Sequence, residues 1–471
     1  TYAAGAGGIK VAGTRNGAGV APTYKENILI SDVTITDFGS LGIEMQFARN
    51  VFINNPIIKR CGYAGILGYS VHKFKVINPE IDTIWGETTS SELNAYGVTF
   101  TSLVNAPDFV RDPQSSECLV FGGTIRNIPT WHGLDTHGGL YIVFDGTIIE
   151  NCRRAAILTN LGIRGAEYCT LKNLVAKNFL TGNNSNDTSK QGEAFWDVGA
   201  SQSVLNKYNQ ILDCHAYQHG DNGAQLGAMY LQYAEHGLVK NVTLKEPWSS
   251  GVFVNSYVSN YSIEGVTVID PKSTGISGGG VTDFPTCIRF AGDNCQGIDV
   301  TNCNMTRKNG SGAAKYGEIG ILHGNFTNNL IRFKGNQFSG IIKNWELLSQ
   351  TGLRGDYDGS FTGTLTGCTT TPTGTVKFSR DNSTVRLIFP QITGTSNSTS
   401  ATITGLPTHL WPATQNIGPV RVMDNGVYKL GFAAIETNGV IALWWDAAGA
   451  GFTNSGIKGI GAFSISYAIS A

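Results

Sequence analysis

The chain has 471 residues with 34 Lys and Arg against 35 Asp and Glu, so its formal net charge is −1. Charged residues make up only 15% of the sequence, and no basic cluster predicts a nucleic-acid-binding surface. The apolar runs are shorter than the about 20 residues that a membrane-spanning helix needs, so membrane insertion is not expected. Nine Cys without C-x-x-C spacing indicate buried thiols, with neither a disulfide framework nor a zinc framework.

The first part of the chain repeats itself. The segment "ENILISDVTITDFGSLGIEMQF" at 26–47 matches "RNVFINNPIIKRCGYAGILGYS" at 49–70, 23 residues later. Further on, "ECLVFGGTIRNI" at 117–128 matches "LYIVFDGTIIEN" at 140–151, again 23 residues later. Looser copies follow, each with short alternating strands and an Asn or Gly near a corner. A period of about 22–28 residues without a helical pattern predicts a right-handed parallel β-helix.

The predicted β-helix covers residues 27–350 in about eleven coils. Residues 1–26 are interpreted as an N-terminal leader or cap. After residue 350 the repeat stops, and alternating strands with strong turn signals at 371–407 predict a C-terminal β-sandwich over 351–471. Because the ends of a solenoid need caps, capping and trimerisation are the expected roles of this domain, with glycan binding as a further one.

Aligning the coils on a shared glycine predicts which side chains lie above one another. The aligned glycines are Gly42, Gly65, Gly97, Gly133, Gly251 and Gly320. The residue after each glycine is expected to point inward and the next one outward. The expected outward column is Glu44, Leu67, Thr99, Asp135, Phe253 and Leu322. Asp135 and His137 are therefore expected on one exposed strand face, with His132 at the corner that leads into it.

The coils that follow add acids, amides and aromatic residues to this face, a pattern that suits a saccharide. In residues 192–200, one strand phase exposes Glu193 and Asp197, and the opposite phase exposes Trp196. We favour the first phase because an unpaired buried carboxylate is costly. The candidate catalytic residues are Asp135, His137, Glu193, Asp197 and Glu235. The candidate substrate-binding residues are Trp131, His132, Asn160, Trp196, Tyr230, Gln232 and Arg289.

Structural roles stay open for several of these residues. The histidines could bond backbone groups at a corner, and Asp135 could belong to an Asn/Asp ladder. Trp196 could be core, and Glu235 a solvated turn residue. No metal or other cofactor is expected, because two His and one Asp near a glycine-rich turn lack a further ligand.

Two carboxylates can hydrolyse a glycosidic bond, with inversion at a separation of about 6.5–9.5 Å and retention at about 5 Å. Asp135 is expected two coils from the strand that carries Glu193 and Asp197, or about 9–10 Å by stacking. His137 would hold Asp135 ionised as the base, and Glu193 would be the protonated acid.

Two other functions remain open. A polysaccharide lyase needs a base and a cation for the sugar carboxylate, which His137, Tyr230 and Arg289 could supply. A non-catalytic receptor-binding adhesin would use the same aromatic face for binding alone.

The coils, the "HGLDTHGG" segment at 132–139 and the Gly- and Thr-rich C-terminal part together resemble the tailspike depolymerases of bacteriophages, within the pectate-lyase-like superfamily. This resemblance implies a homotrimer that cleaves capsular or other bacterial surface polysaccharide outside the cell, as part of the virion. It also implies attachment to the phage tail or baseplate through an N-terminal segment that this chain is expected to lack. Only His132, Asp135 and His137 are matched by motif; the other candidates come from the stacking of coils.

Overall fold

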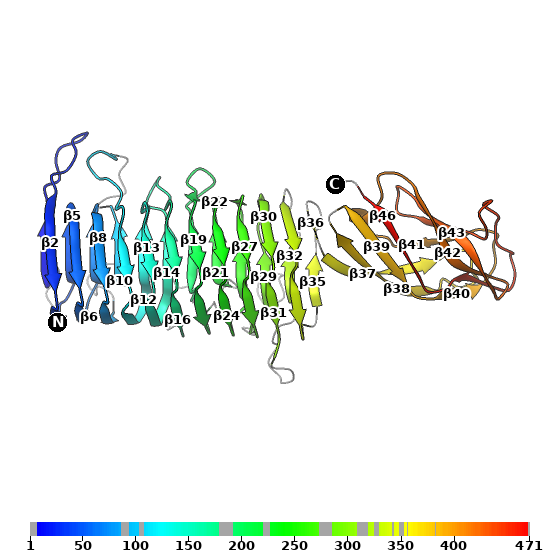
Figure 1. The fold of residues 1–471 in the computed structure, drawn as a ribbon, viewed down its shortest axis with the longest axis horizontal. Coiled ribbons are helices and arrows are strands. Elements are labelled where there is room, and N and C mark those ends of the chain that lie inside the picture. Colours follow the sequence, from blue (N-terminus) through cyan, green and yellow to red (C-terminus); the bar gives the residue numbers. More distant parts are fainter. Residues whose placement is uncertain are drawn as a thin grey trace. The chain divides into compact units, whose positions relative to one another are not determined.

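The structure is a computed structural model. It describes residues 7–85, 94–102, 108–178, 192–219, 227–272, 285–308, 319–324, 329–341, 343–347, 353–355, 357–381 and 383–469. The chain divides into two compact units (Figure 1). The first contains Thr1–Ile331 and Gly335–Ser349, and the second contains Arg332–Lys334 and Gln350–Ala471.

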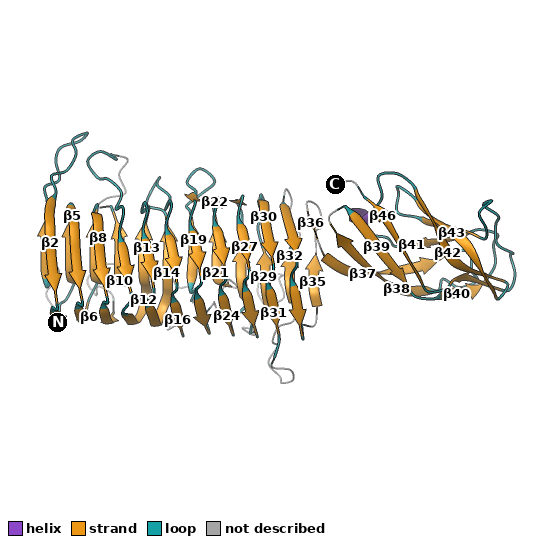
Figure 2. Ribbon diagram, viewed as in Figure 1, coloured by secondary structure: helices purple, strands orange, loops and turns teal. Residues whose placement is uncertain are grey.

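Parallel strands build the first unit, and each strand pairs with the equivalent strand of the next coil (Figures 1 and 2). They form three sheets, which we number 1 to 3; β12 and β14 each continue from sheet 2 into sheet 1. Sheet 1 contains β1 (Ile9–Ala12), β4 (Leu41–Gln46), β7 (Ala64–Tyr69), β10 (Tyr96–Thr101), β12 (Thr124–His137), β14 (Ile148–Thr159), β17 (Phe195–Val198), β21 (Gly227–Gln232), β25 (Ser250–Val254), β29 (Thr286–Phe290), β32 (Ile319–His323) and β35 (Lys343–Leu347). This pairing confirms the predicted parallel β-helix.

Two further sheets complete each coil. Sheet 2 contains β3 (Thr34–Thr36), β6 (Ile57–Cys61), β9 (Glu80–Ile84), the first halves of β12 and β14, β16 (Val175–Lys177), β20 (His215–Tyr217), β24 (Thr243–Lys245), β28 (Thr267–Ile269), β31 (Asn304–Thr306) and β34 (Gln337–Ser339). Sheet 3 contains β2 (Lys25–Ser31), β5 (Ala48–Asn54), β8 (His72–Ile77), β11 (Leu119–Phe121), β13 (Val143–Asp145), β15 (Thr170–Lys172), β18 (Asn206–Lys207), β19 (Gln210–Leu212), β22 (Ala234–Glu235), β23 (Leu238–Lys240), β26 (Val258–Ser259), β27 (Ser262–Glu264), β30 (Gln296–Thr301) and β33 (Leu330–Lys334). Residues 9–12, within the expected leader or cap, thus form a strand of the same stack, where Ile9 pairs with Ile43.

The pairing register agrees with the glycine alignment for the coils that carry the glycine. Asp135 pairs with Thr99, and Leu134 pairs with Val98. Leu134 and Val98 are fully buried in the interior of the solenoid. The thiols are buried as expected, and all nine Cys are free.

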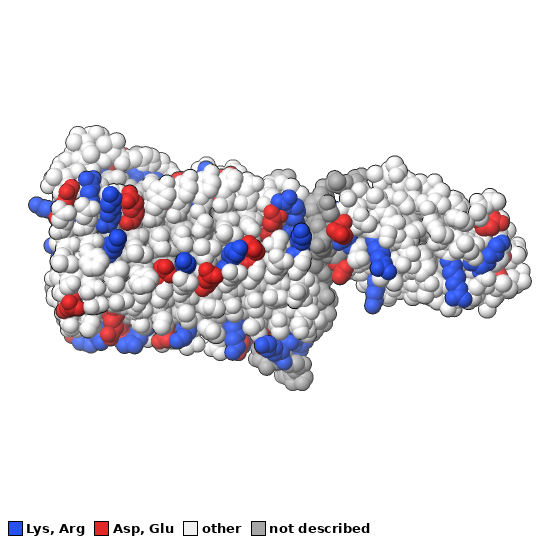
Figure 3. Space-filling view, in the orientation of Figure 1, with Lys and Arg blue, Asp and Glu red and all other residues white. Residues whose placement is uncertain are grey.

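Asn and Gly turn the chain at the corners. Asn55 and Asn78 both have positive φ, and the amide of Asn78 donates to the Oδ1 of Asn55 in the coil before it. Gly122 takes the same left-handed conformation at the next corner. These are the residue types that adopt this conformation at least cost. Between the corners, opposite charges lie side by side on the face drawn in Figure 3, and pairs such as Lys240–Glu264 at 3.2 Å connect successive coils.

The second unit is built on antiparallel strands. It contains β36 (Leu353–Gly355), β37 (Tyr357–Leu365), β38 (Thr373–Asp381), β39 (Thr384–Phe389), β40 (Ile392–Thr395), β41 (Ala401–Thr404), the 3-10 helix η1 (Thr408–Leu410), β42 (Asn416–Asp424), β43 (Val427–Ile435), β44 (Ile441–Trp444), β45 (Ile457–Ile460) and β46 (Phe463–Ala468). Strands β37 to β46 form one ten-stranded sheet in which β42 also packs against β46. The sheet thus folds over its own core, which includes Val376, Leu387 and Phe389. In the described part of both units, no helix has the length and apolar character to cross a lipid bilayer.

The aligned glycines are packed so closely that a larger side chain at this position is expected to destabilise the fold. A Cβ at Gly42 would lie 2.5 Å from the carbonyl oxygen of Gly65 and 2.6 Å from Cγ2 of Ile58. We therefore expect Gly42→Ala to lower the free energy of unfolding by about 1–3 kcal/mol through overpacking. Gly17→Ala is the matched control, because a Cβ at Gly17 meets no atom within 4 Å. Denaturant unfolding followed by tryptophan fluorescence measures both, and equal midpoints would contradict the close approach.

Candidate functional site

The site centres on Asp135, on the outer side of sheet 1. Its backbone pairs with Thr99 on one side and Ile157 on the other. The side chain points outward, as predicted, but it is fully buried and does not lie on an exposed face. The cause is local, because the neighbouring rings of His132 and His137 occupy its two oxygens.

A chain of charged groups extends from Asp135 across the neighbouring coils. Nδ1 of His132 hydrogen-bonds the Oδ2 of Asp135, and Nε2 of His137 lies 3.1 Å from its Oδ1. On the far side of His132, Nη1 of Arg154 donates to Nε2 at 3.3 Å. Nε of Arg154 in turn donates to the Oε2 of Glu193 at 2.8 Å. We call these five residues the charged cluster; only His137, with 25% of its side chain exposed, is more than marginally accessible to solvent.

The cluster sets the protonation state of its central members. Burial alone would raise a carboxyl pKa, but the charges of His137 and His132 outweigh it and hold the pKa of Asp135 well below its usual range. Burial also disfavours the charged form of His137, yet the carboxylate of Asp135 raises the pKa of His137 above its usual value. The backbone of Asn160 hydrogen-bonds the same ring and adds to this rise. Burial lowers the pKa of His132 to about 4. At neutral pH the cluster therefore holds an Asp135 carboxylate and a neutral His132, and the raised pKa of His137 favours its protonated form more than in a free imidazole.

A metal ion is the other group that these side chains could hold. His132, Asp135 and His137 each offer one ligand atom, and these atoms lie within 4.8 Å of one another. If an ion were bound at Nδ1 of His132, the ring proton would lie on Nε2. That nitrogen is 3.3 Å from Nη1 of Arg154, which is itself a donor. Ligating histidines need an acceptor at that position, not a second donor. The contacts of this cluster thus fit a proton-bearing network better than a metal.

Aromatic rings extend the site along sheet 1. Ring centroids follow one another from Tyr96 to His132 at 5.7 Å, to Trp196 at 6.5 Å and to Tyr230 at 5.6 Å. Phe253 continues the row 5.5 Å from Tyr230. The aromatic strip, as we name this row, consists of Tyr63, Tyr96, Trp131, Trp196, Tyr230 and Phe253. Three of the predicted binding residues, Trp131, Trp196 and Tyr230, thus lie in one row of rings. Trp131 and Trp196 are partly exposed, whereas Tyr230 is buried with Phe253.

The arginine of the cluster lies within this strip. The guanidinium carbon of Arg154 is 4.9 Å from the ring of Trp131 and 4.6 Å from the ring of Trp196. Arg289, at the far end, lies 5.4 Å from the ring of Phe253. Gln232 accepts a hydrogen bond from Tyr230, so this predicted binding residue also belongs to the strip.

The favoured phase of residues 192–200 is wrong. Trp196 pairs with Ile157 and Tyr230 in the outward column, and Asp197 points into the solenoid. The interior tolerates this carboxylate because Asn206 and Asn209 donate to its Oδ1 at 2.9 Å and Tyr261 donates to its Oδ2 at 3.0 Å. Burial raises the pKa of Asp197. Asp197 therefore lies away from the substrate face.

Glu193 also differs from its expected role. It reaches the outer side of sheet 1 and joins Asp135 through Arg154 and His132, but its carboxylate is fully buried. An acid that pairs with a guanidinium is kept ionised, so the expected environment for a protonated general acid is absent at this side chain.

Two further predicted residues lie elsewhere. Glu235 belongs to sheet 3, where it pairs with Lys207 at 3.5 Å and His236 at 3.3 Å. The outward positions of β14 are Ile157 and Thr159, so Asn160 follows the end of the strand and contacts His137 only through its backbone.

The sequence analysis missed Arg154 and Tyr96. Arg154 occupies the strand position of His132 one coil later, and Tyr96 occupies it one coil earlier. The coil of Arg154 has Ala155 where the preceding coil has Gly133, and the next two coils have Ala194 and Ala228, which hid the alignment. The pair "RR" in an otherwise apolar strand was the available signal.

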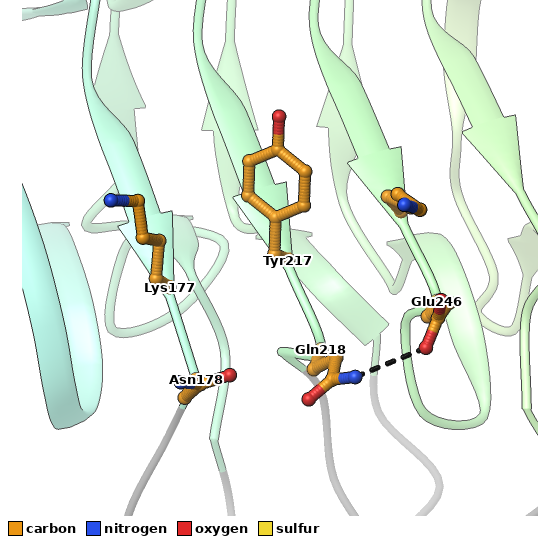
Figure 4. A pocket seen from close by; sticks show the side chains of 6 residues that line it. Lys177, Asn178, Tyr217, Gln218 and Glu246 are labelled. Carbon is orange, nitrogen blue, oxygen red and sulfur yellow. Dashed lines mark hydrogen bonds between the residues drawn. The ribbon is translucent and has the colours of Figure 1, made fainter.

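A separate hollow of about 280 Å³ lies over sheet 2 (Figure 4). Tyr217 stands between Lys177 and Lys245 in successive coils. Lys177 pairs with Glu150 at 3.0 Å, and Gln218 donates to Glu246 at 3.1 Å, as the dashed line in Figure 4 shows. The polar groups that line this hollow are thus largely paired within the protein. The hollow lies on a different face of the solenoid from the charged cluster.

Comparison with known proteins adds likenesses at low identity. No protein-family model matches the chain, and no curated protein matches it. Among solved structures, the Dettilon tailspike protein is 12% identical with a TM-score of 0.35 and covers 92% of this chain and 86% of that chain. The tailspike protein of Pseudomonas phage LKA1 is 12% identical with a TM-score of 0.42, over 92% of this chain and 66% of that chain. A mutant tailspike protein of E. coli bacteriophage HK620, in complex with a hexasaccharide, is 10% identical with a TM-score of 0.41, over 94% and 74%. Several structures similar to the chain are thus tailspikes, the family that its sequence resembles, but identities this low carry no conclusion about activity.

The pairing of Asp135 with His137 predicts a measurable pKa. The ion pair stabilises the fold fully at pH values below the pKa of a free imidazole, which is about 6.5. This stabilisation is lost as the pH rises through the raised pKa of His137. In Asp135→Asn the carboxylate is gone and burial outweighs the remaining hydrogen bond of the Asn160 backbone, so we expect the pKa of His137 to fall below its usual value. Titration of the ¹⁵N-labelled histidine rings measures it. Glu235→Gln, in sheet 3, is the matched control and should leave His137 unchanged; a pKa that Asp135→Asn leaves equally high would contradict the pairing.

Proposed function

We propose that the chain is a phage tailspike that binds a bacterial surface polysaccharide along the aromatic strip and cleaves it at His137. The observation that carries this proposal is the position of the charged cluster between the partly exposed rings of Trp131 and Trp196, in a row whose other members include the buried Tyr96, Tyr230 and Phe253. Sugar rings present apolar faces that pack on aromatic side chains, while their hydroxyls need polar partners. The strip offers both over several coils, a length that suits a polymer.

His137 is the group in the cluster that can meet a substrate. Its ring is one-quarter exposed, whereas Asp135 and His132 are buried beneath it. Asp135 is then a positioning residue, which orients the imidazole and sets its proton affinity. Arg154 and Glu193 hold His132 from the other side.

Elimination is the cleavage chemistry that this arrangement supports best. Hydrolysis by paired carboxylates would require Glu193 to leave Arg154, and Asp197 lies in the interior. Elimination from a uronic acid needs a base and a cation for the sugar carboxylate. Neutral His137 keeps Nε2 toward Asp135 and takes the proton next to the sugar carboxylate on its other ring nitrogen, after the contact with the Asn160 backbone opens. The electrons of the broken C–H bond form the new double bond, and the glycosidic oxygen leaves with a proton from solvent or from the protein.

Hydrolysis is kept as the second candidate on one observation. The coil of Asp135 lies two strand spacings from the coil of Glu193, or about 9.6 Å, near the separation of inverting enzymes. In that reaction a protonated His137 would serve as the acid.

The proposal includes a homotrimer on the virion that acts outside the cell, at the surface of the host bacterium. Sheet 3 supports association, because Leu29 (69% exposed), Phe52 (39%) and Phe121 (47%) leave apolar surface on its outer side. Leu29 and Phe52 occupy the same position in successive coils, and exposed apolar surface of this kind is typical of protein–protein contacts.

The first test is oligosaccharide release from purified capsular polysaccharides, followed by mass spectrometry and ultraviolet absorbance. Loss of a general base lowers the rate by about 10²–10⁴-fold, so we expect the rate of oligosaccharide release to fall by that factor in His137→Ala and in Asp135→Asn. Glu235→Gln is the control and should release oligosaccharide at the unaltered rate. Elimination gives an unsaturated product that absorbs in the ultraviolet, and its rate rises as His137 loses its proton. Hydrolysis gives no such product. Binding without release by the unaltered protein would identify an adhesin instead.

The aromatic strip is tested by binding in the Asp135→Asn background. Trp196→Ala removes a ring that contacts Arg154 and Tyr230, and we expect polysaccharide affinity to fall by about tenfold, or 1.4 kcal/mol. Tyr168→Ala removes an exposed ring that stacks on Tyr141 and Tyr208 away from the strip, and should leave affinity unchanged. Equal affinities of the two variants would place the binding surface elsewhere.

A further inference from the structure

A second cavity lies beyond the end of the strand that carries the charged cluster. It has a volume of about 280 Å³ and is lined by residues that include Phe109, Gln114, Arg164, Glu167, Ser203 and Lys207. Nε2 of Gln114 donates to the carbonyl oxygen of Gly138, the residue after His137, at 2.7 Å. Leu161 and Arg164 close a turn directly after β14 through two backbone hydrogen bonds. The cavity is therefore fixed to the same two strands that hold His137.

Arg164 is a buried arginine with an unfilled donor. Only 8% of the residue is exposed. Its Nη1 donates to the hydroxyl of Ser102 at 3.2 Å and to the backbone oxygen of Asp112 at 2.8 Å. Its Nη2 is buried and has no hydrogen-bond partner among the described residues. The ring of Phe109 covers the guanidinium, with the central carbon 3.7 Å from the ring centroid.

Arg164 also forms no direct ion pair within the described residues, and only the more distant charges of Asp112 and Asp108 act on it. The carboxylate of Asp112 is occupied by Arg15, at 2.6 and 2.8 Å, and by Arg111 at 2.9 Å. Asp108 lies 3.8 Å from Arg111. Within the described residues, no carboxylate lies within 4.0 Å of the Arg164 guanidinium. Burial lowers the pKa of Arg164 to about 10, so the group still carries its charge at neutral pH.

An unpaired buried cation with a free donor is costly unless an anion completes it. Of the other charged groups that line the cavity, Lys207 adds a positive charge and Glu167 a negative one, so the lining as a whole stays positive. Lys207 is itself held by Glu235 at 3.5 Å. Arg164 is thus the group in this cavity that an incoming carboxylate would satisfy.

We propose that this cavity binds the carboxylate of an acidic sugar residue, with Nη2 of Arg164 as the donor and Phe109 against the sugar ring. The inference rests on the proposed function and names its substrate class, an anionic polysaccharide. The volume lies just below the about 300–1,000 Å³ of sites that enclose drug-sized ligands, which fits one sugar unit. The sugar unit bound in this cavity and the sugar unit that meets His137 would be different units of the same polysaccharide chain.

The test uses a variant that leaves every contact of Arg164 in place. Ser203 is an exposed residue of the cavity lining. Ser203→Glu supplies a carboxylate from the protein itself, and Ser203→Gln is the control of equal size without charge. Thermal shift and isothermal titration are measured with glucuronate, with glucose as the neutral partner and with inorganic sulfate as the free anion. We expect the unaltered protein and Ser203→Gln to bind glucuronate, and Ser203→Glu to bind it at least about tenfold more weakly.

Each outcome bears on the site. Preference for glucuronate over both glucose and sulfate supports a sugar carboxylate, whereas equal binding of sulfate and glucuronate reduces the cavity to a free-anion site and overturns the proposal. Equal binding by Ser203→Glu and Ser203→Gln also overturns it. Cleavage assays separate this from the proposed function: if Ser203→Glu cleaves acidic polysaccharide as fast as Ser203→Gln while His137→Ala is inactive, the cavity proposal is wrong and the cleavage site stands.

Discussion

The in-register pairing of parallel strands in sheet 1 is the constraint on which the site depends. Each coil repeats the backbone position of the coil before it, so His132, Arg154 and Glu193 meet although they are far apart in sequence. The side-chain period of a strand is two, and a slip of one residue would turn a whole coil inside out. The backbone hydrogen bonds between coils thus decide which charges meet.

The charged cluster is tolerable in a buried place because its charges alternate. The carboxylate of Glu193 faces Arg154, and the carboxylate of Asp135 faces His137, whose positive form it favours, with neutral His132 between the two pairs. Two indole rings cover Arg154 and keep water away from it. Buried charges that are paired and hydrogen-bonded cost far less than isolated ones. The buried members hold their charges fixed, which leaves His137 as the place where a proton is exchanged.

The repeat made the fold readable from the sequence, and for the glycine-bearing coils it also placed Asp135 beside Thr99 and outside the core. The same reasoning failed at Asp197. The cost of burying a carboxylate was the right principle, but it applies only to an unpaired one. Asn206, Asn209 and Tyr261 satisfy Asp197 from other strands of the solenoid, and their convergence follows from packing that no local pattern encodes. The prediction that Asp135 is exposed failed for a related reason. Its side chain points outward, but the rings of neighbouring residues bury it.

Two buried arginines in this solenoid show how pairing separates structural charge from functional charge. Arg154 has a carboxylate partner and two covering rings, so its charge is balanced within the protein. Arg164 has one covering ring, an unfilled donor and no carboxylate within reach among the described residues. The same solenoid gives Arg154 a carboxylate partner, whereas it gives Arg164 none at hydrogen-bond distance among the described residues. In the proposal made above, an anion that arrives with the substrate fills the donor of Arg164, one turn beyond the strand that carries His137.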